Sequence, residues 1–475
     1  MPVRLFEMRP QKMTEAHQTG DVAELVCSNS LKSGEPENAH GLLKAELRVL
    51  GSVLLECAEL ARVPGGKALV VDRRRFSAEV QSELSRAGVS IERAEVSSLP
   101  PAVGWYRSRA GLSDPHQPTV GGTRDGLGTR SELSDNWPRW PLSDSAVMSR
   151  VSITVVATGP LTSSPMADAL QALLGTEYLF FYDAIAPIAA AESLDMNRIF
   201  EGSRYGAGSD YLNCPMTEEE YDRFVTALLE AELHPVHEFE REVSGHDPNP
   251  EKGFGHVPLF EGCLPVEEIA RRGRLALAFG PMKPVGLADP RTGKRPFAVV
   301  QLRRESADGT IYNLVGFQTR LKRGEQERVF RMIPGLEKVA FLRFGSIHRN
   351  TFLDSPEMLL PTLQTRVGPD LLVAGQLTGV EGYVESIGAG LVAGINAARL
   401  ARGDEPVELP REMMLGGLLH YVTSPTDNFQ PMNANLGLLP PLVKRLRGRD
   451  KRKALSERAL EAARGFALTL VENRA

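Results

Sequence analysis

The hydrophobic pattern along the chain alternates between short apolar runs and longer segments of helical period. Leu371–Ala374 is an apolar run short enough for a buried strand; a glycine-rich turn follows it, and a helical segment rich in glycine and alanine starts at about Tyr383. Small residues let a helix lie close to a sheet, and a glycine turn lets backbone N–H groups approach an anion at the helix N-terminus. Asp370–Ala398 therefore predicts a strand, turn and helix, either closely packed without a ligand or built around one.

The N-terminal part of the chain shows the same alternation of strand and helix. Pro2–Glu7 and Gly88–Glu95 have strand patterns, Asn38–Val63 has the period of one long amphipathic helix, and Phe76–Ala87 that of a second helix. The pattern returns to a buried strand at Val151–Thr158. Strands alternating with helices predict a doubly wound α/β sheet.

The middle of the chain has a different texture. Thr217 and Glu220 stand in capping-box spacing at the start of a helical pattern. Three strand-like segments then follow close together, at Phe297–Arg303, Ile311–Gln318 and Val339–Phe344. Strands this close in sequence favour an antiparallel sheet, so this part predicts a mixed α+β domain inserted into the α/β domain.

We predict a discontinuous first domain and an inserted second one. Residues 101–150 are rich in Gly, Pro, Ser, Asp and Arg and hold all three tryptophans (Trp105, Trp137 and Trp140), which indicates a disordered insertion more than an aromatic binding surface. The predicted parts are 1–100, 151–185 and 335–440 for the first domain, 186–334 for the inserted domain, and 441–475 for a basic helical tail.

Composition and charge limit the classes of function that this chain can have. The net charge of the 475 residues is −5, so contact with nucleic acid requires a local basic patch. Lys444–Lys453 contains seven basic residues and one acid, which indicates either a phosphate-binding patch or a solvated helix face, and Arg271, Arg272 and Arg274 form a smaller cluster. No apolar run approaches the ~20 residues of a membrane span. Four cysteines without CxxC spacing argue against a zinc site and fit a reducing cytoplasm.

Two cysteines are candidates for chemistry. Cys263 comes just before a predicted helix with Pro265 at its first position, and a helix N-terminus favours the thiolate. Cys27 lies among turn-forming residues outside a regular core element. Cys57 and Cys214 are better explained as structural core residues. The histidines show no metal-ligand spacing, and neither a P-loop nor a nucleophile elbow is present.

With these parts assigned, the sequence closely resembles the bacterial folate- and FAD-dependent tRNA (uracil-5-)-methyltransferases, the small sister group of the GidA-type flavoproteins. The resemblance covers nearly the whole chain except Pro101–Arg150, Ser244–Pro258 and the C-terminal end. The motifs that carry it include LFEMRPQKMTEAHQT, AELVCSNSL, ATGPLTS, FFYDAIAPI, DYLNCPMTEEEYDRF, FEGCLPVEEIARRG, FGPMKPVGL, FGSIHRNTF, GQLTGVEGYVES and SPTDNFQPMNANLGLLP.

The resemblance implies a fold, a reaction and its partners. It implies an FAD-binding, Rossmann-like α/β domain, and an inserted domain that binds the tRNA substrate. It also implies methylation of uridine C5 at position 54 of the tRNA T-loop, with 5,10-methylenetetrahydrofolate as carbon donor. The carbon passes through flavin N5, flavin hydride reduces it to methyl, and NAD(P)H restores the reduced flavin. The implied enzyme is thus a cytoplasmic methylenetetrahydrofolate–tRNA-(uracil-5-)-methyltransferase that uses FAD, folate and NAD(P)H.

The family's functional residues fall on matching motifs of this chain. Cys263 in FEGCLP corresponds to the nucleophile that adds to uracil C6, and Cys27 in ELVCSNS to a second thiol that assists methylene transfer or C5 deprotonation. His348 and Arg349 line the flavin or folate site, or have a structural role. The predicted FAD contacts are Glu7, Arg9 and Lys12 at the adenosine end, and Gly375, Gly379, Val380, Glu381, Gly382 and Tyr383 at the flavin end.

One departure from the family pattern concerns the first strand. Family members begin with a strand and a GxGxxG turn, whereas this sequence begins at the counterpart of the second strand, which ends in Glu7. We expect the DNA upstream of Met1 to encode the strand and turn in frame. Two alternatives remain at this stage: GidA-like chemistry at the wobble uridine, and a non-catalytic RNA-binding scaffold that does not bind FAD.

Overall fold

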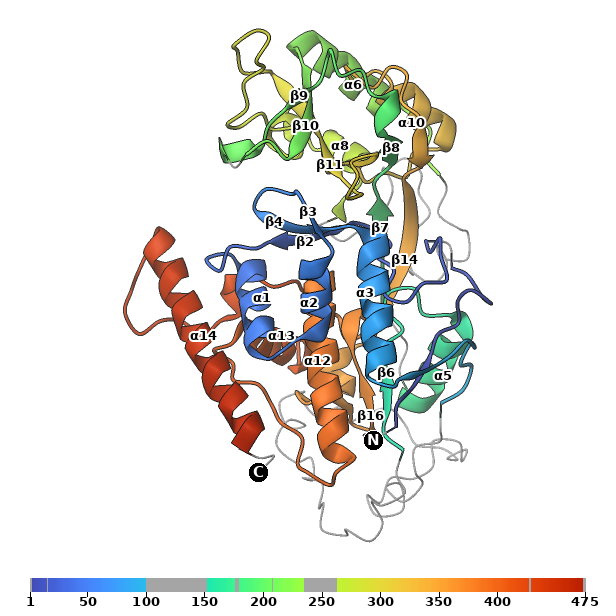
Figure 1. Ribbon diagram of the computed structural model, residues 1–475, viewed down its shortest axis with the longest axis vertical. Helices are drawn as coiled ribbons and strands as arrows, with labels where there is room; N and C mark the ends of the chain where they lie inside the picture. The colour runs from blue at the N-terminus through green and yellow to red at the C-terminus, as the bar shows by residue number, and fades with distance from the viewer. Residues whose placement is uncertain are drawn as a thin grey trace, which may run out of the picture.

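The computed structural model describes residues 2–14, 16–99, 152–175, 179–206, 208–234, 263–426 and 429–472. These residues form a lower and an upper lobe, and the paired strands β7 (Leu179–Ile185) and β14 (Ser346–Phe352) run between them (Figure 1). The predicted insertion at 101–150, with its tryptophans, and the loop at 244–258 lie outside the described residues.

The lower lobe is built from the N-terminal part of the chain, a middle segment at 152–175 and the C-terminal part, around one large hydrophobic cluster in which Leu42, Val373 and Leu418 are fully buried. Its elements are β1 (Arg4–Phe6), β2 (Ser30–Ser33), α1 (Ala39–Val49), α2 (Val53–Leu60), β3 (Arg62–Val63), β4 (Ala68–Val71), α3 (Arg73–Arg86), β5 (Ser90–Glu92), β6 (Thr154–Val156), α5 (Ser164–Leu174), α11 (Ser355–Met358), β15 (Gln364–Thr365), β16 (Gly368–Val373), α12 (Tyr383–Leu400), α13 (Met414–Thr423) and α14 (Gly448–Glu472), with 3-10 turns at Gly375–Thr378 and Leu436–Leu438.

Parallel strands occur in this lobe as two pairs. Among the described residues, β1 pairs with β5, and β6 pairs with β16 so that Val156 stands opposite Val373. Helix α12 contacts both β6 and β16. Its glycines permit this close packing, since a Cβ at Gly388 would lie 2.7 Å from Leu415 of α13. The strand, turn and helix predicted at 370–398 are therefore present.

The prediction of a single helix at Asn38–Val63 is wrong. The structure has two helices, α1 and α2, because Gly51 adopts a left-handed φ of +71° that a right-handed helix does not allow. The next residue, Ser52, then caps α2 by accepting a hydrogen bond from the backbone N–H of Leu55. A continuous apolar period concealed the break, since both helices contribute buried residues to the same hydrophobic cluster.

The upper lobe is a six-stranded sheet in the order β13-β8-β12-β11-β10-β9 with helices packed against it. Its elements are β8 (Ile188–Ala190), β9 (Phe200–Glu201), β10 (Tyr211–Met216), α6 (Glu218–Glu230), α8 (Val266–Arg271), α9 (Ala276–Phe279), β11 (Ala298–Arg304), β12 (Ile311–Leu314), α10 (Arg323–Phe330) and β13 (Phe341–Arg343), with 3-10 turns at Ala191–Ser193 and Arg204–Gly206.

Two features of this lobe match the sequence pattern. Thr217 accepts from the backbone of Glu220, whose side chain accepts from Thr217 N in return, so the predicted capping box is present. The three predicted strands lie in one antiparallel sheet, although β13 pairs with β8 rather than with β12. A second hydrophobic cluster, centred on residues such as Phe224 and Phe317, holds this lobe together. The exact domain boundaries stay a prediction.

Helix α14 carries the end of the described chain back along the lower lobe. It contacts α1, and Ser456 Oγ donates to the Pro36 carbonyl at 2.7 Å. The basic stretch that precedes and opens this helix is exposed, and within it Arg449 forms an ion pair with Glu37. Within the described ranges, no helix combines the length and apolar character needed to cross a lipid bilayer.

Candidate active site

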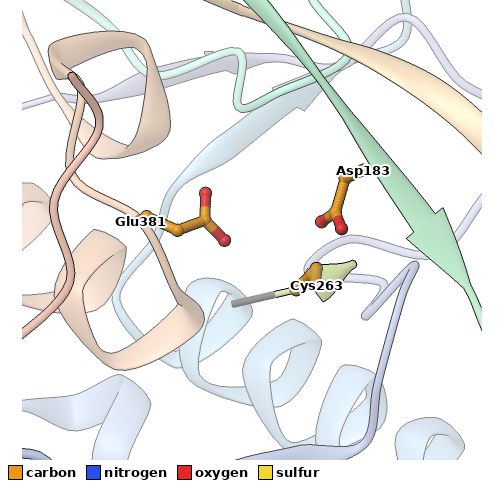
Figure 2. Close-up of side chains that lie close together, drawn as sticks. All are labelled: Asp183, Cys263 and Glu381. Carbon is orange, nitrogen blue, oxygen red and sulfur yellow. The ribbon is translucent and has the colours of Figure 1, made fainter. Parts of the chain in front are cut away.

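Two cysteines and two acidic side chains from four separate parts of the chain meet at one place. Cys27 lies between β1 and β2, Asp183 on β7, Cys263 just before α8, and Glu381 in the turn before α12. The Cys263 sulfur and one oxygen each of Asp183 and Glu381 lie within 4.8 Å of one another, and all three side chains face a common space (Figure 2). Cys27 lies close enough to interact with the same acidic groups. Burial, and then the charges of Asp183 and Glu381, raise the pKa of its thiol to about 12.

The Cys263 thiol is held in its protonated form, which corrects the expectation from its local sequence. Helix α8 has only six residues, and Pro265 is its N-cap rather than its first helical residue. Burial, and then the charge of Asp183, raise the pKa of the Cys263 thiol well above its ordinary value. These effects outweigh a short helix dipole. Asp183 shares a hydrogen bond with this thiol, so the proton has an acceptor in contact with the sulfur.

Tyr383, the first residue of α12, holds Cys27. Its hydroxyl accepts the backbone N–H of Cys27 at 2.9 Å and that of Ser28 at 3.4 Å. A hydrogen bond between this hydroxyl and the thiol lowers the pKa of Cys27 against the larger effect of burial. Contact between Tyr383 and the flavin stays a prediction. The structure shows in addition that this side chain holds Cys27 at the N-terminus of α12 through hydrogen bonds.

Arginines hold the loop that carries Cys27. Arg73 donates to the carbonyl of Leu25, and Arg343 of the upper lobe donates to the carbonyl of Val26 at 2.9 Å. Arg73 is itself fixed by Glu305, at 2.8 Å. The loop between β1 and β2 is thus bonded to both lobes, which keeps Cys27 at a fixed position relative to the upper lobe.

Arg303, on β11, makes the most extensive of these contacts. Its Nε donates to Asn29 Oδ1 and its guanidinium to Ser28 Oγ, both at 2.9 Å, and the side chain is buried. We expect Arg303→Met to lower the free energy of unfolding by about 2 kcal/mol, since one buried acceptor, Asn29, and one half-buried acceptor, Ser28, lose their donor. Displacement of Cys27 should also lower the methylation proposed below by roughly 10²-fold.

Arg303→Lys is the matched variant for this prediction. It keeps the positive charge and loses the fixed fork of donors, so its methylation rate should fall nearly as far as that of Arg303→Met. Thermal unfolding and initial methylation rates on the same preparations measure both effects. Wild-type methylation by Arg303→Met would show that the arginine does not position Cys27.

The glycine-rich turn lies between β16 and α12, as its sequence predicts. Gly375, Gly379 and Gly382 have φ values of +71°, +82° and +117°, which a side chain rarely permits. A Cβ at Gly379 would lie 2.5 Å from the ring of Phe429, and one at Gly382 would lie 2.4 Å from the Glu385 carboxylate. Gly382 is the N-cap residue of the 18-residue helix α12, and this helix N-terminus has no capping hydrogen bond from a side chain. A helix N-terminus without a side-chain cap suits an anionic group such as a reduced flavin.

Val380 and Glu381 lie within this turn. Val380 is fully buried and forms an isolated parallel bridge with Met432, whose carbonyl accepts the Glu381 N–H at 2.8 Å. The Glu381 side chain accepts a hydrogen bond from Gln376 at 2.5 Å and points toward Asp183 and Cys263 (Figure 2). Burial, then the charge of Asp183, raise the pKa of Glu381 well above its ordinary value. One of two neighbouring carboxyls is thereby favoured as the neutral acid.

One face of the β7–β14 ribbon lines the same site. His348 stands directly opposite Asp183, and Asn350 lies diagonally across from it on the same face. His348 Nδ1 is buried and has no hydrogen-bond partner among the described residues, and burial lowers the pKa of this ring to about 4. A neutral imidazole nitrogen of this kind fits a hydrogen bond to a ligand. Arg349 stands opposite Tyr182 and therefore belongs to the other face of the ribbon.

Glu7, Arg9 and Lys12 lie at the start of the lower lobe. Arg9 donates to Glu7 at 2.8 Å and to Glu24 at 3.0 Å, and its side chain is nearly buried. Lys12 forms an ion pair with Glu95 at 2.6 Å. Glu7 follows β1 directly, which is the place of a ribose-binding acid. Contact of these residues with the adenosine end of FAD stays a prediction.

Sequence reasoning missed Asp183 and the arginine contacts. The one signal for Asp183 was an acid inside the apolar strand pattern FFYDAIAPI, where burial of a charge is costly. The arginines act on a loop far away in sequence, so no local pattern reveals them. The two remaining cysteines are buried core residues, as expected: Cys57 on α2 and Cys214 on β10.

The small basic cluster of the upper lobe is occupied by protein acids. Arg274 donates to Glu218 and Asp222, both at 2.7 Å, and Arg271 pairs with Glu268. These arginines therefore carry less unpaired charge toward phosphate than the sequence implied. The Lys444–Lys453 stretch stays the stronger candidate for that contact.

Comparison with known proteins agrees with this geometry. The family described as glucose inhibited division protein A matches residues 1–405. A protein of Moorella thermoacetica named methylenetetrahydrofolate–tRNA-(uracil-5-)-methyltransferase TrmFO is 51% identical over 97% of this chain and 92% of its own. A protein of the same name from Heliobacterium modesticaldum is 49% identical over 98% of this chain and 92% of its own.

Solved structures agree on the fold. GidA of Aquifex aeolicus in its form I crystal gives a TM-score of 0.60 at 14% identity, covering 99% of this chain and 74% of that chain. The form II crystal gives a TM-score of 0.57 at 16% identity, covering 95% and 70%. The predicted α/β, Rossmann-like fold class is confirmed by this likeness, together with the helices and sheets described above.

Proposed function

This chain belongs to the TrmFO family of methylenetetrahydrofolate–tRNA-(uracil-5-)-methyltransferases, and we propose that it methylates C5 of the uridine at position 54 in the tRNA T-loop. The carbon donor is 5,10-methylenetetrahydrofolate, and NAD(P)H supplies the electrons. The substrate is a tRNA, and the reaction belongs to the cytoplasm, where tRNA and folate are found.

The observation that supports this function best is the meeting of Cys27 and Cys263. Cys263 is partly exposed and in contact with a carboxylate, and Cys27 is held beside the same carboxylates by Tyr383. Uracil C5 is a weak nucleophile until a sulfur adds at C6 and makes C5 enolate-like. A second group must then take the C5 proton. Two thiols within one acidic site provide both functions.

The roles divide according to contacts. Cys263 shares its hydrogen bond with Asp183, so its proton has a place to go when the sulfur attacks C6. Cys27 lies against Tyr383 at the N-terminus of α12, on the flavin side of the site. We assign Cys263 as the nucleophile and Cys27 as the thiol that assists methylene transfer or removes the C5 proton.

FAD fits the turn before α12. Gly375, Gly379 and Gly382 hold this turn in positive-φ conformations, and the N-terminus of α12 has no side-chain cap, so it would stabilise the negative charge of a reduced flavin. When bound, the flavin supplies the one-carbon transfer and the hydride. This chain's own groups orient it, with His348 Nδ1 as a further polar group facing the site.

The basic stretch Lys444–Lys453 is the proposed phosphate contact for tRNA. Its side chains are exposed, and neutralising several phosphates gives affinity that falls with salt. The target uridine is stacked in a folded T-loop, so it must be extruded to reach Cys263. Phosphate contacts at a distance from the site hold the RNA while this happens.

The two alternatives from the sequence are not favoured. Wobble-uridine chemistry is disfavoured because relatives at 51% and 49% identity carry the uracil-5-methyltransferase name. A scaffold without catalysis is disfavoured because both thiols, the acids and the uncapped α12 are present in one site.

A direct assay tests the function. The purified flavin-containing protein is incubated with methylenetetrahydrofolate, NADH or NADPH, and either a T-arm or an anticodon-arm RNA. We expect 5-methyluridine in the T-arm product by mass spectrometry and none in the anticodon arm. Modification of the anticodon arm alone would favour the wobble reaction, and a colourless protein without product would favour the scaffold.

A further inference from the structure

Asp183 occupies a position that the two-cysteine scheme leaves unexplained. It is 4% exposed, and the strand β7 that carries it is held in register with β14 over seven residue pairs. One of its carboxylate oxygens lies within 4.8 Å of the Cys263 sulfur, and interaction with this thiol lowers the pKa of Asp183 against the larger effect of burial. An ionisable group this deeply buried is costly, so its retention beside the nucleophile calls for a role in the reaction.

We propose that Asp183 is the catalytic base that takes the proton from Cys263 as the sulfur adds to uracil C6. The proposal rests on the methylation function above. In the step, the S–H bond breaks and its proton moves to an Asp183 oxygen while the S–C6 bond forms. The C5=C6 electron pair moves toward C5 and O4. When the S–C6 bond later breaks, the Asp183 acid returns the proton to the sulfur, so no oxidant or reductant is required.

The surroundings of Asp183 suit a base that works near neutral pH. Burial raises the pKa of Asp183, while the interaction with Cys263 and the hydrogen bond from Ala184 N, at 2.9 Å, oppose this shift. A base of raised pKa takes a proton more readily once the sulfur begins to attack. The contact with the thiol, and not the pKa alone, identifies the residue, since the base must reach the proton it removes.

Other charged groups face this carboxyl and bear on its titration. Glu381 lies across the site from the turn before α12, and Cys27 lies in the loop between β1 and β2. Lys32, on β2, opposes the raised pKa of both carboxyls. His348, opposite on β14, is neutral because burial lowers its pKa to about 4. The attack rate should therefore rise with pH as the Asp183–Glu381 pair loses its first proton.

The test compares Asp183→Asn with wild type in two reactions of the flavin-containing enzyme. The first is covalent attachment to a T-arm RNA with 5-fluorouridine at the target, because fluorine at C5 blocks the proton loss that completes turnover. The second is alkylation of Cys263 by iodoacetamide, followed on its peptide by mass spectrometry. Attachment requires a base, whereas alkylation requires only thiolate.

We expect Asp183→Asn to slow attachment about 10²-fold or more, and to remove its rise with pH. Alkylation of Cys263 should be unchanged or faster, because the loss of a neighbouring negative charge lowers the pKa of the thiol. Glu46→Gln is the matched control. Its carboxylate is also fully buried, but it accepts from Met414 N and Leu415 N at the start of α13. It should leave both rates near wild type.

Two results would overturn the proposal. Attachment by Asp183→Asn within about threefold of wild type would show that the base is another group. An equal fall of attachment and alkylation would show that Asp183 only maintains the shape of the site. A wild-type enzyme that forms no adduct and no 5-methyluridine would instead refute the proposed function, which separates that failure from this one.

Discussion

Replacement of Cys263 by alanine is expected to abolish methylation of T-arm RNA, with a fall of at least about 10³-fold. In the proposed mechanism the Cys263 sulfur is the atom that bonds to C6, and this described thiol lies within 4.8 Å of both Asp183 and Glu381. Without the S–C6 bond, uracil C5 does not become enolate-like. Methylation is measured as 5-methyluridine formed per enzyme per minute under saturating folate and NAD(P)H.

The controls for Cys263→Ala separate chemistry from folding. Cys214→Ala removes a fully buried thiol of the same lobe, on β10, and should keep most of the activity. Flavin absorbance of Cys263→Ala should match that of wild type, since Cys263 is not among the predicted FAD contacts. Full methylation by Cys263→Ala would refute the nucleophile assignment.

Replacement of Cys27 by alanine is expected to give the second large loss, about 10²–10⁴-fold in methylation. The physical reason differs, because Cys27 acts after the sulfur of Cys263 has added to C6. Attachment of the enzyme to 5-fluorouridine RNA should therefore persist in Cys27→Ala and vanish in Cys263→Ala. The pair of assays, methyl product and covalent attachment, distinguishes the two thiols.

The control for Cys27→Ala is Cys57→Ala. Cys57 is a buried thiol of the same lobe, on α2, with no contact to the acidic site. Loss of attachment in Cys27→Ala together with retention in Cys263→Ala would reverse the two roles. Equal methylation by Cys27→Ala and Cys57→Ala would remove Cys27 from the mechanism.

Much of the fold could be predicted because its signals are local. The capping box at Thr217 and Glu220 requires residues only three apart, and the strand, turn and helix at 370–398 are marked by an apolar run and by glycines. The break between α1 and α2 could not be predicted in this way, because Gly51 lies in an unbroken apolar period and only its φ of +71° ends the helix. The antiparallel sheet of the upper lobe was predicted from strands close in sequence, whereas the pairing of β13 with β8 depends on the whole sheet and has no local signal.

The site divides in the same way. The two cysteines proposed as catalytic were predicted from family motifs, and the glycine turn was predicted from its composition. The protonation of Cys263 was predicted with the wrong sign, because Asp183 is 80 residues away in sequence and no local pattern brings it to the sulfur. Arg303 was missed for the same reason, since it acts on Ser28 and Asn29 across the two lobes. Local patterns reveal which groups are reactive, and only the tertiary fold sets their charge.

The location of the covalent bond between the enzyme and the RNA tests the proposed mechanism most directly. The wild-type, flavin-containing protein is allowed to react with T-arm RNA carrying 5-fluorouridine, digested with protease and nuclease, and analysed by tandem mass spectrometry. The proposed mechanism predicts a single cross-linked peptide, with the nucleotide on the sulfur of Cys263. A nucleotide bonded to Cys27 or to any other residue, or recovery of only unmodified Cys263 peptide, would contradict it.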